Sequence, residues 1–118
     1  MTPSPTRGEI WWAQLPADPP GKSARPVIIV SANGRNHNER ANTVLCVPLS
    51  TMLRAGAPFQ LLLKSGETGM REDGMAMADN LTVIRKEWLR PPKASQRILS
   101  NTRICELANM VRMAMGCV

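Results

Sequence analysis

One arginine and a pair of hydroxyl residues are the side chains of this sequence best suited to chemistry. Arg25 begins an apolar stretch that runs to Ser31, and Ser50 and Thr51 end another that begins at Thr43. An arginine offers a planar, permanently charged fork to two phosphate oxygens. A neighbouring hydroxyl could donate to a third oxygen or to a leaving group. A simpler interpretation stays open, in which Arg25 is a surface ion-pair partner and the two hydroxyls cap a turn.

The residue sets of the common enzyme mechanisms are absent from the sequence. It has no glycine-rich phosphate loop and no GxSxG motif, and its single histidine, His37, lies in a polar segment. Its three cysteines, Cys46, Cys105 and Cys117, form no CxxC pair, so we expect reduced and mostly buried thiols. The sequence therefore predicts neither a metal site nor a cofactor.

Cleavage of RNA without a metal needs only the side chains that remain. RNA carries its own nucleophile, the 2′-hydroxyl, so the protein must orient it in line with the phosphate and stabilise the developing charge. Trp11 and Trp12 are adjacent, so in a strand they face opposite sides. We assign the outward position to Trp12, where it could stack on a base or pack in the core or an interface.

Length and charge limit the class of protein. The chain of 118 residues suits one domain, and its 43% hydrophobic content excludes wholesale disorder. Fifteen basic against nine acidic residues give a net charge of +6, which favours phosphates or an acidic partner. No apolar run approaches the ~18 residues of a membrane span, and no secretory signal is visible. We expect a soluble, cytoplasmic protein.

The elements that would position these residues are mostly short strands. Ten prolines and eight glycines disfavour an all-helical bundle. We predict strands over 9–15, 25–31, 43–51 (broken at Pro48), 58–63, 75–78 and 81–84, with the polar pair Asp79–Asn80 between the last two. We expect an irregular turn or short helix at 33–42 and a turn at 64–74.

A helix should end the chain. Ser100 is a suitable N-cap, and an apolar stripe follows at Ile104, Leu107, Ala108, Val111 and Met115. The prediction is a mainly β, single-domain protein, a small antiparallel barrel with a C-terminal helix. Residues 1–6 should form a flexible tail and residues 7–118 the folded domain.

Several motifs occur in an order that resembles the MazF/PemK/Kid toxin family. These are RGEIWWAQL, RPVIIVS, TVLCVPLST, DGMAMADN and the final helix, and together they cover about residues 7 to 115. The resemblance implies a barrel of the CcdB/PemK-toxin type, which is Src-homology-3-like. It also implies a metal- and ribosome-independent endoribonuclease that cleaves single-stranded RNA at short motifs, leaving 2′,3′-cyclic phosphate and 5′-hydroxyl ends. Such a toxin would inhibit translation and growth, act as a homodimer and bind an acidic, MazE-like antitoxin.

The resemblance also suggests a role for individual residues. Arg25 matches the family's catalytic arginine, and Ser50 holds the catalytic hydroxyl position, where threonine is usual and Thr51 is the alternative. Asp79 and Asn80 match an acidic-plus-amide pair that contacts the nucleotide. The loop 16–24 departs from the pattern, since it has no glutamate near Pro20 and no histidine precedes Arg25. The local substitutes for a helper there would be Lys22 or Ser23.

Two further features bear on function. A basic run around Trp88 (Arg85, Lys86, Arg90, Lys93 and Arg97) could follow an RNA backbone, hold an acidic antitoxin segment or simply be a solvated face. The alternative function is a CcdB-like DNA gyrase poison without catalytic activity. Such poisons rely on a tryptophan in the C-terminal tail, and this chain ends MGCV.

Overall fold

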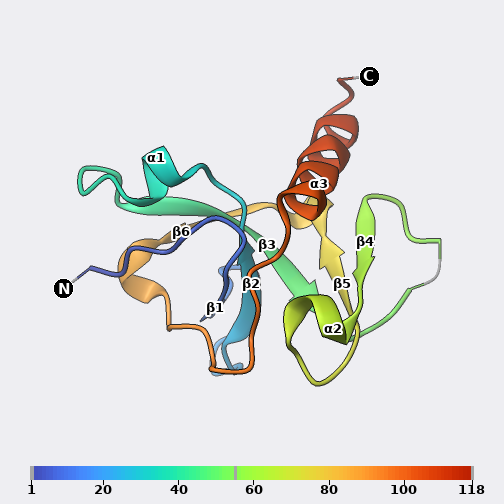
Figure 1. The fold of residues 1–118 in the computed structure, drawn as a ribbon, viewed down its shortest axis with the longest axis horizontal. Coiled ribbons are helices and arrows are strands. Elements are labelled where there is room, and N and C mark those ends of the chain that lie inside the picture. Colours follow the sequence, from blue (N-terminus) through green and yellow to red (C-terminus); the bar gives the residue numbers. More distant parts are fainter. Residues whose placement is uncertain (1, 55, 118) are drawn as a thin grey trace.

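The longest strand, β3, is the element that all the others are arranged around (Figure 1). The computed structural model describes residues 2–54 and 56–117. On one edge β3 pairs with β2, and on the other it pairs first with β6 and then with β5. β1 pairs with β2, and β4 pairs with β5, all antiparallel. The strands are β1 (Ile10–Ala13), β2 (Arg25–Ile29), β3 (Thr43–Ser50), β4 (Gln60–Leu63), β5 (Gly74–Met77) and β6 (Thr82–Arg85).

A single bridge closes part of this sheet into a barrel. After β6 the chain makes the 3-10 turn η2 (Lys86–Trp88), and Arg90 then returns to the free edge of β1. The Trp12 N–H donates to the Arg90 carbonyl at 3.0 Å, and the Arg90 N–H donates to the Trp12 carbonyl at 2.8 Å. Closure removes an open strand edge and confirms the predicted small barrel.

The barrel interior holds an apolar cluster that includes one of the two adjacent tryptophans. Trp11 points inward and is only 9% exposed, whereas Trp12 lies on the outer face and is half-buried. Cys46 lies in the same interior, and burial raises the pKa of its thiol to about 12, which makes it unreactive. Cys105 and Cys117 are exposed, so the expectation of mostly buried thiols was wrong. Cys105 lies on the outward side of a helix that covers the sheet with its other side.

The C-terminal helix α3 (Asn101–Ala114) covers the outer face of the sheet. The Ser100 hydroxyl accepts the Arg103 N–H at 3.3 Å, which confirms the predicted N-cap. Ile104 and Leu107 pack against Ile10, Ile28 and Leu49 in a second apolar cluster. Val111 of the predicted stripe is partly buried against the same cluster, whereas Ala108 is exposed and Met115 is 74% exposed. The helix extends beyond the sheet, so its last turns have nothing to pack on (Figure 1).

Two very short helices lie between strands, the first in a segment predicted as an irregular turn or short helix and the second in a segment predicted as a turn. α1 (Asn33–Asn36) precedes β3, and α2 (Ser65–Thr68) follows β4. Arg103 of α3 donates to Glu67 of α2 at 2.7 Å, and this hydrogen bond, with that from the Lys64 backbone, lowers the pKa of the Glu67 carboxyl. α2 is thereby joined to α3.

The N-terminal segment makes defined contacts. Pro5 is buried, and the Thr6 N–H donates to Glu9 Oε1 at 2.5 Å. The flexible tail over residues 1–6 stays a prediction. Met1 and Val118, which bound the predicted tail and domain, lie outside the described residues.

Pro48 was predicted to break its strand, but β3 runs through it without interruption. The interruption lies in the facing chain, between β5 and β6. Leu45 directs its carbonyl to Val30 on the β2 side, so Pro48, three positions on, directs its nitrogen to the other edge. A proline has no N–H to donate there. At that edge residues 77–81 oppose only residues 47–48, because the chain leaves the ladder to form η1 (Ala78–Asn80) between β5 and β6. This confirms the predicted interruption at Asp79–Asn80.

Gly69 provides a test of the packing between α2 and the chain before α3. Its φ is +74°, and an added Cβ would lie 1.9 Å from the Ser95 carbonyl oxygen. We expect Gly69→Ala to lower the free energy of unfolding by clearly more than the ~1–2 kcal/mol cost of a left-handed residue. Gly21→Ala is the control, because Gly21 has a φ of +83° and open space around it. Equal losses in urea denaturation of the two variants would show that the close approach to Ser95 is unimportant.

Candidate active site

An open cleft of about 730 Å³ lies where β2 begins and β3 ends. β2 contributes Arg25 and β3 contributes Ser50. Asp79 and Asn80, which lie in η1 outside the strand pairing, also line the cleft. The cleft thus collects polar side chains from four separate stretches of the chain. Six of the predicted site residues line it, namely Lys22, Arg25, Ser50, Thr51, Asp79 and Asn80.

Ser23 and Trp12 do not line the cleft. Ser23 is exposed between two lining residues, Lys22 and Ala24. Trp12 lies across the ladder from Pro26, which does line it. The Trp12 indole N–H donates to Gln96 Oε1 at 3.0 Å, and Lys93 Nζ lies 4.3 Å from the ring centroid. The ring of Trp12 therefore already has a cation over it.

The acidic partner of Arg25 is Asp18, which the sequence analysis did not identify. Arg25 Nη1 lies 3.3 Å from Asp18 Oδ1, and the two side chains are only 23% and 12% exposed. Asp18 Oδ2 is buried and has no hydrogen-bond partner among the described residues. The carboxylate thus stands in the loop that lacks a glutamate, two positions before Pro20. In the sequence, the one feature that could have pointed to Asp18 is its place in a Pro/Gly-rich loop that leads into the strand of Arg25.

The loop that carries Asp18 is folded back on itself. The Asp18 N–H donates to the Leu15 carbonyl at 3.0 Å, which makes a tight turn directly after β1. At its other end, Gln14 Nε2 donates to the Lys22 carbonyl at 2.8 Å. These two bonds hold the loop so that its carboxylate reaches the guanidinium at the start of β2.

Ser50 combines both interpretations that the sequence left open. Its hydroxyl oxygen accepts the Met52 N–H at 3.1 Å, so it caps the turn after β3, and it also lines the cleft. The cap orients the hydroxyl and leaves its proton available for donation. Thr51 is exposed and also lines the cleft.

Arg54 and Gln60 are lining residues that sequence reasoning missed. Arg54 lies in the loop after β3, and Gln60 begins β4. A single arginine in a loop has no distinguishing spacing. Arg54 joins Lys22 and Arg25 as a third cation in the cleft, which one carboxylate, that of Asp79, also lines. Asp18, the partner of Arg25, lines a neighbouring hollow instead.

The arrangement suits a phosphate-containing ligand. Three cations and two hydroxyls can engage phosphate oxygens, and an exposed Asp–Asn pair can hydrogen-bond to other groups of the same ligand. The described residues contain no group of three or more His, Cys, Asp or Glu side chains that could hold a metal ion. Asp73, a conceivable partner of Asp79, instead accepts the Ser65 N–H at 2.8 Å, which lowers the pKa of its carboxyl, and does not line the cleft.

The ion pair between Asp18 and Arg25 should contribute to stability. We expect Arg25→Ala to lower the free energy of unfolding by about 1–3 kcal/mol, because it leaves a largely buried carboxylate without a partner. Adding Asp18→Ala should recover part of that loss. The matched control is the exposed pair Arg85–Glu87, at 2.7 Å, where coupling should stay below about 1 kcal/mol. Urea denaturation of both double-mutant cycles measures this, and equal coupling would contradict it.

The comparisons with known proteins agree with this fold. The family described as "PemK-like, MazF-like toxin of type II toxin-antitoxin system" matches residues 6–115. The Mycobacterium tuberculosis protein named endoribonuclease MazF9 is 32% identical over 99 residues, covering 73% of this chain and 77% of that protein.

Solved structures show the same fold at lower sequence identity. A mycobacterial endoribonuclease in complex with its cognate antitoxin has a TM-score of 0.74 at 23% identity, covering 97% of each chain. A MazE–MazF complex from Deinococcus radiodurans has a TM-score of 0.74 at 17% identity, covering 98% of this chain and 99% of that one. With the match along almost its whole length, the chain belongs to the PemK-like, MazF-like toxins of type II toxin–antitoxin systems, a family of endoribonucleases.

Proposed function

We propose that this protein is a sequence-specific endoribonuclease that cleaves single-stranded RNA without a metal or a ribosome. It would act on mRNA, and on rRNA or tRNA where the motif is accessible, and so inhibit translation and growth. The observation that carries this proposal is the cleft in which Arg25, Ser50 and two further cations meet the Asp79–Asn80 pair. The 32% identity to a protein named as an endoribonuclease supports the same activity.

The proposed reaction uses the 2′-hydroxyl of the RNA as nucleophile. Its oxygen loses a proton and forms a bond to the adjacent phosphorus, while the bond from phosphorus to the 5′-oxygen breaks and that oxygen takes up a proton. The products are a 2′,3′-cyclic phosphate and a 5′-hydroxyl. Negative charge grows on the non-bridging oxygens, and the protein accelerates the step by stabilising that charge.

Arg25 fits the role of charge clamp in this step. A guanidinium keeps its charge near pH 7 and is a poor proton acceptor, so its contribution is a fixed fork toward two oxygens. Asp18 holds one arm of the fork at 3.3 Å and so restricts where the rest can point. The Ser50 hydroxyl, oriented by the Met52 N–H, is placed to donate to a third oxygen or to the leaving group.

Asp79 and Asn80 are suited to reading the RNA. Both are exposed and stand outside the strand ladder in η1. An amide offers two donors and an acceptor, and a carboxylate offers acceptors, which match the edges of an unstacked base. Lys22 and Ser23, in the loop before β2, would add contacts to the phosphate backbone of the RNA. Stacking of a base on Trp12 would require Lys93 to leave the ring.

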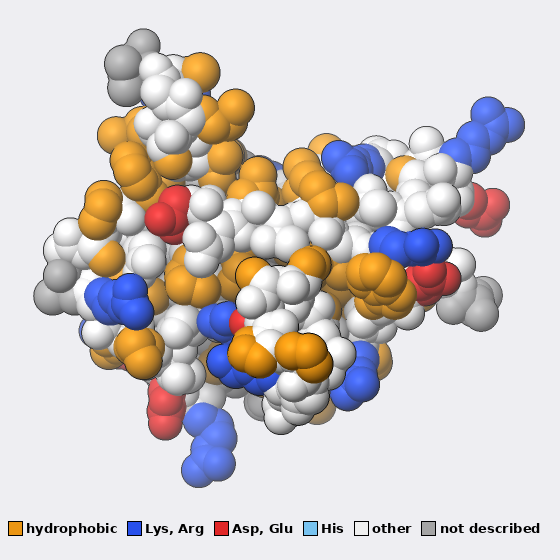
Figure 2. Space-filling view, turned by 180° about the vertical axis from the view of Figure 1, so that it is seen from behind, with side chains coloured by type: hydrophobic (Ala, Val, Ile, Leu, Met, Phe, Trp, Pro, Cys, Tyr) orange, Lys and Arg blue, Asp and Glu red, His pale blue; other side chains and the backbone are white. Residues whose placement is uncertain are grey.

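A homodimer and an acidic antitoxin are the proposed partners. Apolar side chains gather along the projecting helix α3 (Figure 2), where Met113 and Met115 are exposed. An unpaired apolar face of this kind favours a symmetric contact between two copies. Two relatives of the same fold have been solved with antitoxins, and a net charge of +6 suits an acidic, MazE-like segment lying over the cleft. No described helix is long and apolar enough to cross a membrane, and we propose a cytoplasmic location.

Cleavage of a long single-stranded RNA in excess EDTA, mapped by primer extension, tests the activity. We expect discrete cuts by the wild type and a loss of ~10²–10³ in rate for Arg25→Lys, which keeps the charge but loses the fork. Ser50→Ala should lose less if water replaces the hydroxyl. Arg71→Ala, which removes a charge outside the cleft, should cleave normally. Intact RNA with folded wild-type protein would reject the nuclease and direct attention to gyrase poisoning.

Binding of the antitoxin should depend steeply on salt. Cations of the cleft would be neutralised by carboxylates of the antitoxin, and salt screens that attraction, with a Debye length of about 10 Å at 0.1 M. Titration calorimetry with the acidic segment as a peptide, at low and high ionic strength, measures the dependence. An affinity that does not change with salt would show that apolar contacts hold the complex.

A further inference from the structure

We propose that a second pocket, beside Trp88, binds a base of the RNA a few nucleotides away from the cleavage site. The inference rests on the proposed nuclease activity, since it assigns a further part of the same substrate to the protein. The pocket lies on the side of the barrel where η2 follows β6, and has a volume of about 650 Å³.

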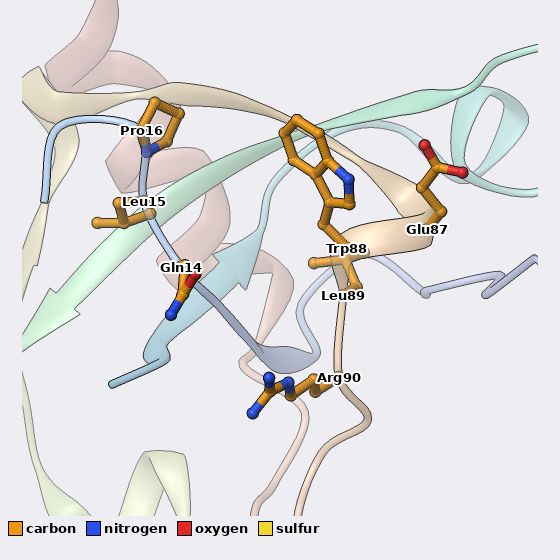
Figure 3. A pocket seen from close by; sticks show the side chains of 7 residues that line it. All are labelled: Gln14, Leu15, Pro16, Glu87, Trp88, Leu89 and Arg90. Carbon is orange, nitrogen blue, oxygen red and sulfur yellow. The ribbon is translucent and has the colours of Figure 1, made fainter. Parts of the chain in front are cut away.

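Trp88 presents its ring to this pocket (Figure 3). The side chain is 54% exposed, which is costly for a tryptophan unless something covers it. In Figure 3 the Pro16 ring lies on the opposite side of the opening, so a flat group could enter between them. Leu15 and Leu89 form the apolar floor. An exposed aromatic ring facing an open slot is the arrangement on which single-stranded bases stack.

Polar groups lie at one end of the slot. The Arg90 guanidinium points toward Gln14 in Figure 3, and Arg90 takes part in no ion pair among the described residues. Gln14 Nε2 is used by the Lys22 carbonyl, which leaves its Oε1 as an acceptor. A donor fork and an acceptor beside an aromatic face can engage a phosphate and the edge of a stacked base.

The charges around the slot favour a polyanion. Arg85 lies over one face of the Trp88 ring, 5.5 Å from its centre, so a base would stack on the other face, and Arg85 is paired with Glu87 at 2.7 Å. Glu87 also lines the pocket, at the end away from Arg90, and its ion pair with Arg85 offsets part of its charge. With Arg85 and Arg90 against one carboxylate, the balance of charge at the slot is positive.

The slot lies close to the candidate active site. A hollow of about 480 Å³ lies between them and shares Leu15 and Pro16 with the Trp88 slot. It shares Arg25 and Asn80 with the active-site cleft. β6 runs along this path, and its span from Thr82 to Arg85 is about 10 Å, on the order of three stacked nucleotides. One strand of RNA can therefore contact Arg25 and Trp88 at once, and this favours RNA over a small ligand that fills the slot alone.

The test compares two substrates once the cleavage motif has been mapped. One RNA extends several nucleotides beyond the motif on both sides, and the other ends at the motif. We expect Trp88→Ala to lower kcat/KM on the long RNA by ~5- to 150-fold, the range that base–aromatic stacking supports, mainly through KM. On the short RNA the variant should match the wild type. Trp88→Phe, which keeps an aromatic face, should retain most of the activity, and Arg71→Ala is the control for non-specific effects.

Tryptophan fluorescence gives a readout that does not depend on turnover. An RNA with a 2′-deoxy sugar at the scissile nucleotide lacks the nucleophile and stays intact. Its binding should quench emission in the wild type and much less in Trp88→Phe. Quenching that persists in this variant would assign stacking to another tryptophan and overturn the inference.

The outcomes separate this inference from the function on which it rests. If the wild type cleaves RNA and Trp88→Ala cleaves both substrates equally well, the nuclease stands and the Trp88 site is wrong. If the wild type cleaves nothing, the proposed function itself fails. If Trp88→Ala, with unchanged thermal stability, weakens only an acidic antitoxin peptide and not RNA, the slot belongs to a protein partner and the inference is overturned.

Discussion

A proline that cannot donate a hydrogen bond is the constraint on which the site depends. Pro48 lies within β3 and turns its nitrogen toward the edge shared by β5 and β6. With no donor at that point, the facing chain can leave the ladder without losing a bond to Pro48. It does so as η1, which carries Asp79 and Asn80 out of the sheet. Because Pro48 pairs with Val27 on its other side, the released residues emerge close to the start of β2, where Arg25 stands.

The ion pair between Asp18 and Arg25 gives that opening its chemical character. A guanidinium free in solvent would sample many orientations, and a carboxylate on one arm restricts them. The carboxylate has its own requirement, since Oδ2 is buried without a partner among the described residues. A substrate phosphate would compete with Asp18 for the same guanidinium, so the pair must be strong enough to orient Arg25 and weak enough to share it. Partial burial, rather than full burial, of the two side chains meets both requirements.

The two apolar clusters divide the structural work between the two faces of the sheet. The barrel interior, closed by the bridge between Trp12 and Arg90, fixes the strands that carry the site. The outer cluster anchors only the first turns of α3, and the end of the helix keeps its apolar side chains exposed. The candidate cleft and the exposed end of α3 thus project from a core that is complete without a ligand or a partner.

The sequence by itself determined the strands, the interruption at Asp79–Asn80, the Ser100 cap and the candidates Arg25 and Ser50. Each of these depends on local spacing: alternation, a turn residue, a cap or a motif within about ten positions. Only the tertiary structure decided that Asp18 is the partner of Arg25, that Arg54 joins the cleft and that Met115 has nothing to pack on. It also placed the slot of Trp88 beside a hollow that shares Leu15 and Pro16 with it, and Arg25 and Asn80 with the candidate active site. These features join residues that no periodicity relates, and they follow from loop paths and from barrel closure, which depend on contacts formed across the whole chain.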